Sequence, residues 1–313
     1  MVKKGDIVDI ISPASSCTKE EISQIKNYIT SIGFVPRILF EEDMILRSKL
    51  DGSFALTPSA IRFKQLYQAL KNSDSKLIWC TKGGYGSGDL LPFLASAKSI
   101  LQTKMFIGFS DITSISTFLQ QSWGWQVVCG PMLIQMIDGG KLTVNKKSQQ
   151  ELLNLIFNKK NNLKYDLTAL NNAKFSNIKA EIVGGCLSVL AGHFGGDFQI
   201  DFADKILFLE DVDESGEKLD RYFRQIVEVI LKTKKKPKAI LLGEFGYGIK
   251  DKIKQKNITH SFERFSSRID EFKLNIPVFK TKIFLGHSDK MMPLILGGKS
   301  EVGQDKVLYQ FCN

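Results

Sequence analysis

The sequence predicts an α/β protein whose first half forms a mostly parallel β-sheet covered by helices. Two observations lead to this prediction. Short apolar runs alternate with helical patterns through the first half, which is typical of βαβ units. A stretch rich in Lys and Asn and poor in aliphatic residues then separates this half from the next. We therefore expect an N-terminal domain over residues 1–157, a linker over 158–177 and a C-terminal domain over 178–313.

Short apolar runs of the first half are the expected strands. They are Ile7–Ile11, Phe34–Phe40, Leu77–Cys80, Met105–Phe109 and Gln126–Cys129. A helix is expected over Ser59–Lys71, because Ile61, Leu66 and Leu70 follow a helical spacing. A second helix, Ser148–Phe157, is expected just before the linker.

The second half contains its own strand patterns and one strong helix. The expected strands are Glu181–Val183, Ile206–Glu210, Ala239–Gly243 and Ile283–Leu285. Apolar residues on one face predict a helix over Glu217–Leu231. The tail, Leu294–Phe311, has Gly297-Gly298 between two apolar stretches and predicts a terminal β-hairpin.

Composition narrows the class of protein. The 313 residues are 43% hydrophobic and 24% charged, which is ordinary for a globular protein with a core. No apolar run approaches the roughly 18 residues that span a bilayer, and the N-terminus lacks the apolar segment of a secretory signal. A cytoplasmic location without membrane contact is expected. Five cysteines, with no C-x-x-C pair, predict neither a disulfide framework nor a metal site.

The net charge of +10 does not indicate a nucleic-acid partner. Lysines are spread along the chain, and their densest run, residues 232–238, flanks Pro237 at a helix end. No aromatic residues interleave with that run, as a base-stacking surface requires. A solvated helix end is the simpler interpretation, although a positive field could attract an acidic peptide substrate.

A serine follows one of the expected strands directly. Met105–Phe109 leads into Ser110-Asp111, and a helical pattern begins after them. A serine at a sharp strand-to-helix turn projects its hydroxyl from the sheet edge, and the next backbone amide points toward the same place. The alternative is that Ser110 or Asp111 only caps the helix.

A glycine-rich loop, Cys80–Gly88, comes directly after another strand. Glycines let backbone amides approach a ligand and form an anion-binding nest. The loop fits neither G-x-x-x-x-G-K-[ST] nor G-x-G-x-x-G opening a helix. It can supply an oxyanion donor, bind a phosphate, or only turn the chain.

Two further groups end strands of the second half. Glu210 is the last residue of an apolar strand, whereas Asp213 and Glu214 after it fit the start of a helix. A carboxylate fixed by a sheet is the partner that orients a catalytic imidazole. His287 follows Gly286 after an apolar run, and a structural role for it is equally open.

At these residues the chain resembles the S66 family of serine peptidases, the LD-carboxypeptidases, which includes the microcin C self-immunity peptidases. The resemblance covers nearly the whole chain. It is carried by Ile11–Ser15, Gly83–Gly86, Gly108–Thr113, Gly130–Met132, Gly184-Gly185 with Leu187-Ser188, Leu209–Asp211, and Gly286-His287 with Pro293. Each segment is short, and their joint order and spacing make the resemblance specific.

The resemblance implies a Rossmann-like N-terminal domain and a β-rich mixed C-terminal domain, usually found in homodimers. It implies Ser110 as the nucleophile, Glu210 as the triad acid and His287 as the general base. The backbone amides of Gly84 and Asp111 match the oxyanion hole. The implied substrate is a murein tetrapeptide that loses its terminal D-alanine in cell-wall recycling, and no cofactor is implied.

Departures from the family pattern bear on the substrate. Family members commonly carry Arg before the Gly-Gly-Tyr-Gly loop, and this chain has Lys82 there. Lys82 and Tyr85 of the loop are the expected substrate contacts. The usual Gly-Gly-Asn-Leu has Cys186 in place of Asn. The stretch His193–Phe198 also differs from the usual Gly-Thr-Pro.

Two other functions remain open at the level of sequence. A self-immunity hydrolase of peptidyl or aminoacyl nucleotides should need a larger, aromatic-lined pocket, and no extra loop in the sequence supplies one. A non-catalytic protein could instead bind phosphate or a sugar with its glycine loop. In that case Ser110→Ala leaves all activity unchanged.

Overall fold

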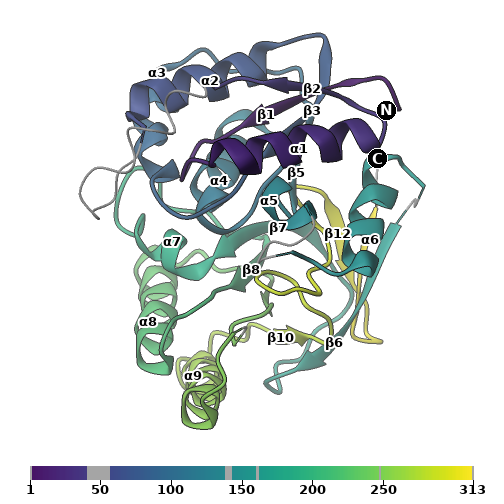
Figure 1. Ribbon diagram of the computed structural model, residues 1–313. Helices are drawn as coiled ribbons and strands as arrows, with labels where there is room; N and C mark the ends of the chain where they lie inside the picture. Colours follow the sequence, from purple (N-terminus) through teal and green to yellow (C-terminus); the bar gives the residue numbers. More distant parts are fainter. Residues whose placement is uncertain (1, 41–56, 138–142, 160–161, 247, 312–313) are drawn as a thin grey trace. The chain divides into compact units, whose positions relative to one another are not determined.

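The computed structural model describes residues 2–40, 57–137, 143–159, 162–246 and 248–311. The chain divides into two compact units, unit 1 over Met1–Lys159 and unit 2 over Lys160–Asn313. Each unit is built around its own sheet (Figure 1).

Unit 1 contains a parallel sheet with the strand order β5-β4-β3-β1-β2. Its strands are β1 (Ile7–Ile11), β2 (Val35–Ile38), β3 (Ser75–Cys80), β4 (Met105–Ile107) and β5 (Val127–Cys129). Its α-helices are α1 (Lys19–Ser31), α2 (Ser59–Lys71), α3 (Leu91–Ser96), α4 (Thr113–Trp123), α5 (Leu133–Met136) and α6 (Lys146–Ile156). Two 3₁₀ turns, η2 (Ser87–Leu90) and η3 (Ser110–Ile112), follow β3 and β4.

Local sequence explains these elements. In β1, Val8, Ile10 and Ile11 are fully buried, as expected where helices cover both faces of a parallel sheet. Helix α1 begins with a capping box, in which Thr18 and Glu21 each accept the other's backbone amide.

Unit 2 is a closed barrel with the strand order β10-β6-β13-β12-β7-β8-β9. Its strands are β6 (Asn162–Ala169), β7 (Ile178–Cys186), β8 (Ile206–Glu210), β9 (Ala239–Leu242), β10 (Val278–Thr281), β12 (Lys299–Val302) and β13 (Val307–Phe311), and β11 (Leu294–Leu296) precedes β12. The neighbours β7, β8, β9 and β10 pair in parallel, whereas β6, β12 and β13 pair antiparallel. The barrel is therefore mixed.

The described residues of unit 2 form three helices, α7 (Leu187–Ala191), α8 (Gly216–Thr233) and α9 (Lys252–Glu271). The apolar faces of α8 and α9 meet in a core cluster with the barrel strands. At its centre the rings of Phe223 and Phe265 stack, with centroids 4.5 Å apart.

The predicted fold class is confirmed, with a parallel α/β sheet in unit 1 and a mixed β-rich unit 2. Helix α2 and strands β1 and β8 have the predicted bounds. The range 158–177, assigned above to a linker, contains strand β6. Alternating burial along β6, with Leu163, Tyr165 and Leu167 inward, explains how a chain so rich in Lys and Asn still joins the barrel.

One strand prediction in unit 2 was wrong, and the terminal hairpin has its turn at a different place than expected. Residues 283–285 form no strand, because their carbonyls accept single hydrogen bonds from Thr281, Met292 and Glu244 rather than a ladder. The terminal hairpin is β12–β13, and its turn is residues 303–306 instead of Gly297-Gly298. Lys306 adopts the left-handed conformation there, with φ 58°, and donates its amide to Gly303.

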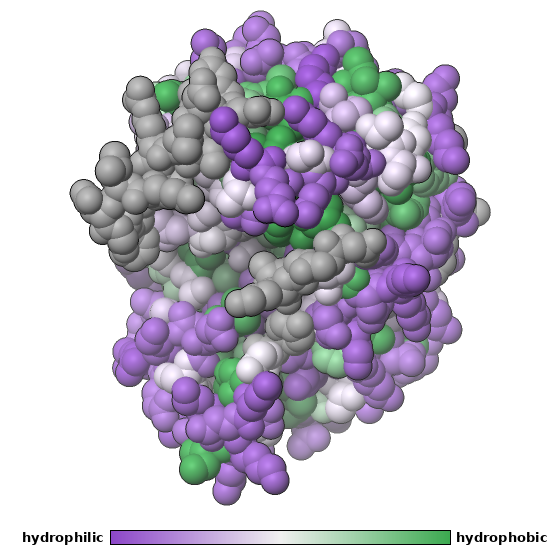
Figure 2. Space-filling view, in the orientation of Figure 1, coloured by the Kyte–Doolittle hydropathy of each residue, from purple (hydrophilic) through white to green (hydrophobic). Residues whose placement is uncertain are grey.

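Hydrophilic residues cover most of the face seen in Figure 2, and hydrophobic residues are scattered among them. Large apolar side chains that are exposed lie at separate places in the chain, including Val35, Leu101, Ile253 and Phe272. None of the helices in the described part of the chain is both long and apolar enough to cross a membrane.

Candidate active site

Ser110 lies on a strained turn at the end of β4. Its φ is 61°, in the left-handed region that a residue with a side chain rarely adopts. The residue before it, Phe109, is extended, and the 3₁₀ turn η3 starts at Ser110 itself. This is the backbone geometry of a nucleophile elbow, where strain is retained to present a side chain.

The glycine loop lies directly against this turn. A Cβ atom on Gly83 would stand 2.9 Å from Ser110 Cβ, 3.0 Å from its Oγ and 3.4 Å from the Asp111 amide nitrogen. Gly84 has a φ of +101°, and a Cβ there would overlap Ser15. Glycine at both positions therefore allows the loop to reach the serine and the amide that follows it.

Hydrogen bonds fasten the loop to the serine turn. The Asp111 carboxylate accepts the Ser87 amide at 2.8 Å, and the Ser87 hydroxyl donates to the Asp111 carbonyl. Gly83 in turn accepts the Ser15 amide at 3.2 Å. Since neither η3 nor α4 has a side-chain cap, the alternative of a mere helix cap for Ser110 or Asp111 is not supported.

A buried arginine under the loop escaped the sequence analysis. Arg62 on α2 is 1% exposed, and its guanidinium donates to the carbonyls of Pro13 at 2.6 Å, Gly86 at 2.7 Å and Thr57 at 2.8 Å. The available signal was its i, i+4 spacing from Leu66 on the buried face of α2. Arg62 therefore joins Pro13, just after β1, to Gly86 in the glycine loop.

The two expected substrate contacts differ in their surroundings. Lys82 is 25% exposed in its side chain, and its Nζ lies 3.2 Å from Glu21 Oε2, an oxygen that also accepts the Thr18 amide. Tyr85 is 55% exposed at the tip of the loop. The ammonium group therefore has a fixed counter-ion, whereas the phenol ring faces solvent.

In unit 2, Glu210 and His287 form a hydrogen-bonded pair. Glu210 ends β8 and is fully buried, and its Oε2 accepts both the His287 amide at 3.0 Å and His287 Nδ1 at 2.7 Å. Two bonds to one oxygen fix both the ring and its backbone. With Nδ1 donating, the neutral imidazole has its lone pair on Nε2, which is the arrangement a general base requires.

Gly286 makes this pair possible. Its φ is +102°, and a Cβ there would overlap Glu210 Oε2 and lie 2.7 Å from Glu210 Cβ. Only glycine lets the chain pass the carboxylate closely enough for His287 to turn back onto it.

The charges around His287 favour its protonated form. Burial works against the imidazolium, but the charge and hydrogen bond of Glu210, followed by the charges of Asp211 and Asp213, outweigh it and raise the pKa of His287. The imidazolium that forms when a serine gives up its proton is stabilised by the same groups.

The described residues offer no metal site and no exposed cysteine thiol. In the described ranges, no three or more His, Cys, Asp or Glu side chains are grouped so that they could hold a metal ion. Cys17, Cys80, Cys129 and Cys186 are buried and form no disulfide among the described residues, and Cys312 lies outside them. Burial above all raises the pKa of Cys17, to about 11, so its thiol stays protonated at neutral pH.

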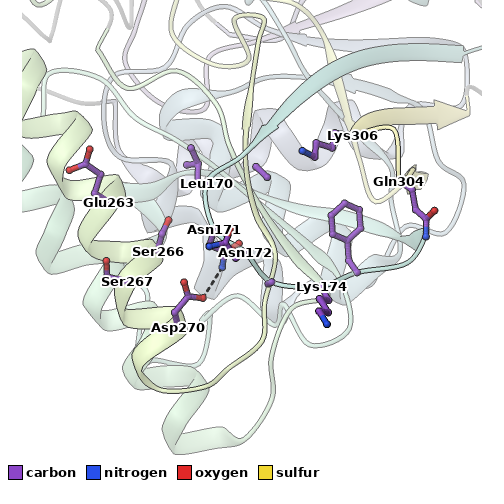
Figure 3. A pocket seen from close by; sticks show the side chains of 13 residues that line it. Leu170, Asn171, Asn172, Lys174, Glu263, Ser266, Ser267, Asp270, Gln304 and Lys306 are labelled. Carbon is purple, nitrogen blue, oxygen red and sulfur yellow. Dashed lines mark hydrogen bonds between the residues drawn. The ribbon is translucent and has the colours of Figure 1, made fainter.

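A groove of about 920 Å³ in unit 2 is lined by side chains, most of them polar, from α9, the segment after β6 and the β12–β13 turn (Figure 3). Asn171 crosses part of it with a 3.2 Å bond to Asp270. Leu170 donates its amide to Val278, the first residue of β10, so the groove lies at the amino ends of the parallel strands. Glu210 lies at the carboxyl end of β8, and the groove is therefore separate from the Glu210–His287 pair.

Each half of the predicted site is formed within one unit. Unit 1 brings Ser110 together with the loop of Gly84 and the Asp111 amide. Unit 2 brings Glu210 together with His287. The remaining histidines lie elsewhere: His260 is exposed on α9 beside Glu263, and His193 follows α7.

Two family models match the sequence, one in each unit. The model described as the LD-carboxypeptidase N-terminal domain matches residues 8–130. The model described as the LD-carboxypeptidase C-terminal domain matches residues 179–302. Ser110 falls in the first range, and Glu210 and His287 fall in the second.

Individual proteins match over most of the chain. A Rickettsia prowazekii protein named Putative carboxypeptidase RP402 is 30% identical over 303 residues, covering 96% of this chain and 88% of its own length. The murein tetrapeptide carboxypeptidase of Pseudomonas aeruginosa is 29% identical over 210 residues, or 65% of each chain. The crystal structure of an MccF-like protein from Bacillus anthracis matches with a TM-score of 0.77 and 20% identity, covering 100% of this chain and 98% of its own.

Proposed function

Because the chain belongs to the LD-carboxypeptidase family (peptidase family S66), we propose that it is a serine carboxypeptidase that hydrolyses an L,D-peptide bond. The observation that carries the proposal is the buried Glu210 carboxylate holding His287 through Nδ1 at 2.7 Å. An imidazole held in this tautomer needs only a hydroxyl partner to generate a nucleophile.

In the proposed reaction, His287 Nε2 takes the proton of the Ser110 hydroxyl while Oγ attacks the carbonyl carbon of the scissile bond. The carbonyl oxygen gains the negative charge and accepts hydrogen bonds from the amides of Gly84 and Asp111. Each such donor contributes about 3 kcal/mol to the transition state in comparable enzymes. The Glu210 side chain holds the imidazolium through Nδ1.

The tetrahedral intermediate then breaks its carbon–nitrogen bond. His287 gives its proton to the departing amine, which leaves as a D-amino acid, and Ser110 retains the acyl group as an ester. Water then releases the acyl group. His287 removes a proton from the water, the oxygen attacks the ester carbonyl carbon, and the imidazolium returns the proton to the Ser110 oxygen as it leaves.

The proposed substrate is a murein tetrapeptide that loses its terminal D-alanine, as the name of the Pseudomonas aeruginosa relative indicates for that protein. A carboxypeptidase must recognise a free carboxylate next to the scissile bond. Lys82 is the proposed partner for that carboxylate, since it immediately precedes Gly83, which lies against Ser110. Tyr85 is a proposed contact for the rest of the peptide.

The central experiment incubates the purified protein with muropeptide tetrapeptide and measures free D-alanine. Wild type is expected to release it, and Ser110→Ala, His287→Ala and Glu210→Gln are expected to lose at least about 10³-fold in kcat/KM. Exposed counterparts, Ser176→Ala and His260→Ala, serve as matched controls and should match wild type. Equal release by wild type and Ser110→Ala would identify a non-catalytic protein or contamination.

The carboxylate contact is tested separately with Lys82→Met and Lys82→Arg. Lys82→Met removes the charge, so KM should rise about 10-fold while kcat changes little, since ground-state binding is lost. Lys82→Arg should restore or improve KM, because a guanidinium binds a carboxylate with two hydrogen bonds. Unchanged KM in both variants would remove Lys82 from the substrate site.

A second candidate substrate is a peptidyl nucleotide. MccF is the name of the microcin C7 self-immunity protein of Escherichia coli, and an MccF-like structure from Bacillus anthracis has the same fold along the whole chain. Parallel assays with an aminoacyl sulfamoyl adenosine and with tetrapeptide separate the two substrates. We expect the tetrapeptide to give the higher kcat/KM.

We further propose that the enzyme acts in the cytoplasm and as a homodimer. Light scattering of the purified chain should give about twice the 35.2 kDa mass of one copy. Cell fractionation should recover the native protein with cytoplasmic markers. A monomer with full activity would contradict the first expectation, and recovery outside the cytoplasm would contradict the second.

A further inference from the structure

A second buried carboxylate lies directly behind the acid–base pair. Asp211 follows Glu210 and is 1% exposed. Its Oδ2 accepts the Ser188 amide at 2.7 Å. Its Oδ1 accepts the Val212 amide at 2.9 Å, the Ser188 hydroxyl at 3.1 Å and the Cys186 thiol at 3.4 Å. One side chain thus satisfies four donors.

These hydrogen bonds connect three strand ends. Cys186 is the last residue of β7 and stands in register with Glu210, the last residue of β8. Ser188 lies in the first turn of α7. The backbone amide of Asp211 also donates to the Glu244 carbonyl beyond β9, at 3.0 Å. Asp211 therefore fixes the end of β8, which carries Glu210, to both of its neighbouring strands.

Glu210 depends on this fixation. Of its two carboxylate oxygens, Oε2 accepts both bonds from His287, and Oε1 is buried without a hydrogen-bond partner among the described residues. Because Oε1 has no such bond among the described residues, the direction of the carboxylate follows largely from the backbone that bears it. A fixed backbone at residues 210–211 therefore keeps Oε2 directed toward the imidazole.

We propose that Asp211 is a positioning residue for the Glu210–His287 pair, fixing the strand end that carries the acid and adding a second negative charge that stabilises the imidazolium. This inference rests on the proposed function, in which His287 must become protonated during the reaction. Nothing in the family motifs considered above assigns a role to this carboxylate.

The electrostatics agree with this role. Burial first, and the charge of Glu210 second, raise the pKa of Asp211 to about 6 despite its hydrogen bonds from Val212 and Ser188. The ionised form therefore lowers stability above that pH, and a carboxylate retained at such a cost is characteristic of functional sites. The titratable groups around Asp211 are Glu210, His287, the Cys186 thiol and the Tyr222 phenol of α8. The charge of Asp211 helps to raise the pKa of Tyr222.

Cys186 gives the network a graded test. Its thiol is a weak donor to Asp211, and the hydroxyl of a serine is a stronger one of similar size. Cys186→Ser should lower the pKa of Asp211 and keep the network, whereas Cys186→Ala removes the donor and raises that pKa. Activity at neutral pH should be highest in Cys186→Ser, intermediate in wild type and lowest in Cys186→Ala.

The decisive experiment follows the imidazole of His287 by NMR in the full chain as pH is varied. Asp211→Asn should move the His287 titration to lower pH by about half a unit or more, because a neighbouring charge is lost. The control is Asp213→Asn, because Asp213 raises the pKa of His287 through its charge and has a φ of 59° that Asn accepts. Its shift should be smaller.

Activity provides the second readout. Asp211→Asn should lower kcat/KM for the tetrapeptide about 10-fold, mainly through kcat, and move the acidic limb of the pH profile to lower pH. Ser188→Ala removes one hydrogen-bond donor and so should raise the pKa of Asp211, and it should lower kcat less than Asp211→Asn does. If Asp211→Asn is too unstable to study, this variant and the Cys186 series still test the network.

The outcomes separate this inference from the proposed function. A fall in thermal stability with an unchanged His287 titration makes Asp211 merely structural and overturns the inference. Absence of tetrapeptide hydrolysis by wild type overturns the proposed function. The NMR titration needs no substrate, and its expected shift would still place Asp211 in electrostatic contact with the pair.

Discussion

The Ser110 turn of unit 1 and the Glu210–His287 pair of unit 2 are held in place by different means. Around Ser110 the constraint is steric, since a left-handed serine lies against Gly83 with no room for a methyl group. Around His287 the constraint is electrostatic, since Glu210 and Asp211 are buried carboxylates. A nucleophile needs an exact position, whereas a base also needs a tuned charge. The two regions should therefore respond differently to mutation and to pH.

Gly286→Ala should have the largest effect. The added Cβ overlaps Glu210 Oε2 and the residue has a φ of +102°, so the His287–Glu210 bond must break. We expect kcat/KM for the tetrapeptide to fall about 10³-fold or more, as when a triad acid is lost. The matched control is Gly248→Ala, where φ is +81° but no atom lies within 4 Å. Equal losses in both variants would indicate backbone strain instead of a broken pair.

Gly83→Ala should have the second-largest effect, and it should act only by displacing Ser110. Its Cβ would press on Ser110 from 2.9 Å, without the strain of a positive φ. We expect a loss of about 10²-fold in kcat with little change in the pH profile, because position and not charge is altered. Gly196→Ala, whose nearest atom is 3.5 Å away, is the control. A shifted pH profile in Gly83→Ala would contradict the distinction between the two regions.

Arg62→Met should mainly reduce stability. It leaves the buried carbonyls of Pro13 and Gly86 without their donor, at a cost of about 3 kcal/mol in the free energy of unfolding. Urea denaturation measures this loss. Arg224→Met, at an exposed ion pair with Glu228, should change stability by less than about 1 kcal/mol. Similar losses in both would exclude the proposed support of the glycine loop.

The smallest expected effect is a pH dependence of stability in unit 2. Because the pKa of Asp211 in the folded protein is about 6, above its ordinary 3.8, the folded state takes up a proton first as pH falls. Its contribution to stability is complete below the ordinary pKa and is lost as pH rises through 6. The raised pKa of His287 acts in the same direction.

Between pH 8 and pH 5.5 we expect the Asp211 carboxyl to add about 1 kcal/mol of stability. Denaturation curves at the two pH values measure it, and Asp211→Asn should reduce the difference while Gly83→Ala should leave it unchanged. A difference that persists in Asp211→Asn would assign the pH dependence to other groups.

Sequence reasoning served best where the evidence is local. Ile7–Ile11, Ser59–Lys71 and Ile206–Glu210 have strong apolar patterns and obtained their predicted bounds. It was least successful for Ile283–Leu285 and for β6, where partners distant in the sequence decide whether an apolar or alternating run joins a sheet.

The sequence alone determined the fold class, the family and the residue types that could carry the chemistry, because periodicity and ordered motifs are properties of the chain itself. The contacts of Arg62 and Asp211, and the need for glycine at Gly83 and Gly286, were decided only by tertiary structure. Burial and close approach bring together residues that lie tens of positions apart, and no local pattern records which atoms meet.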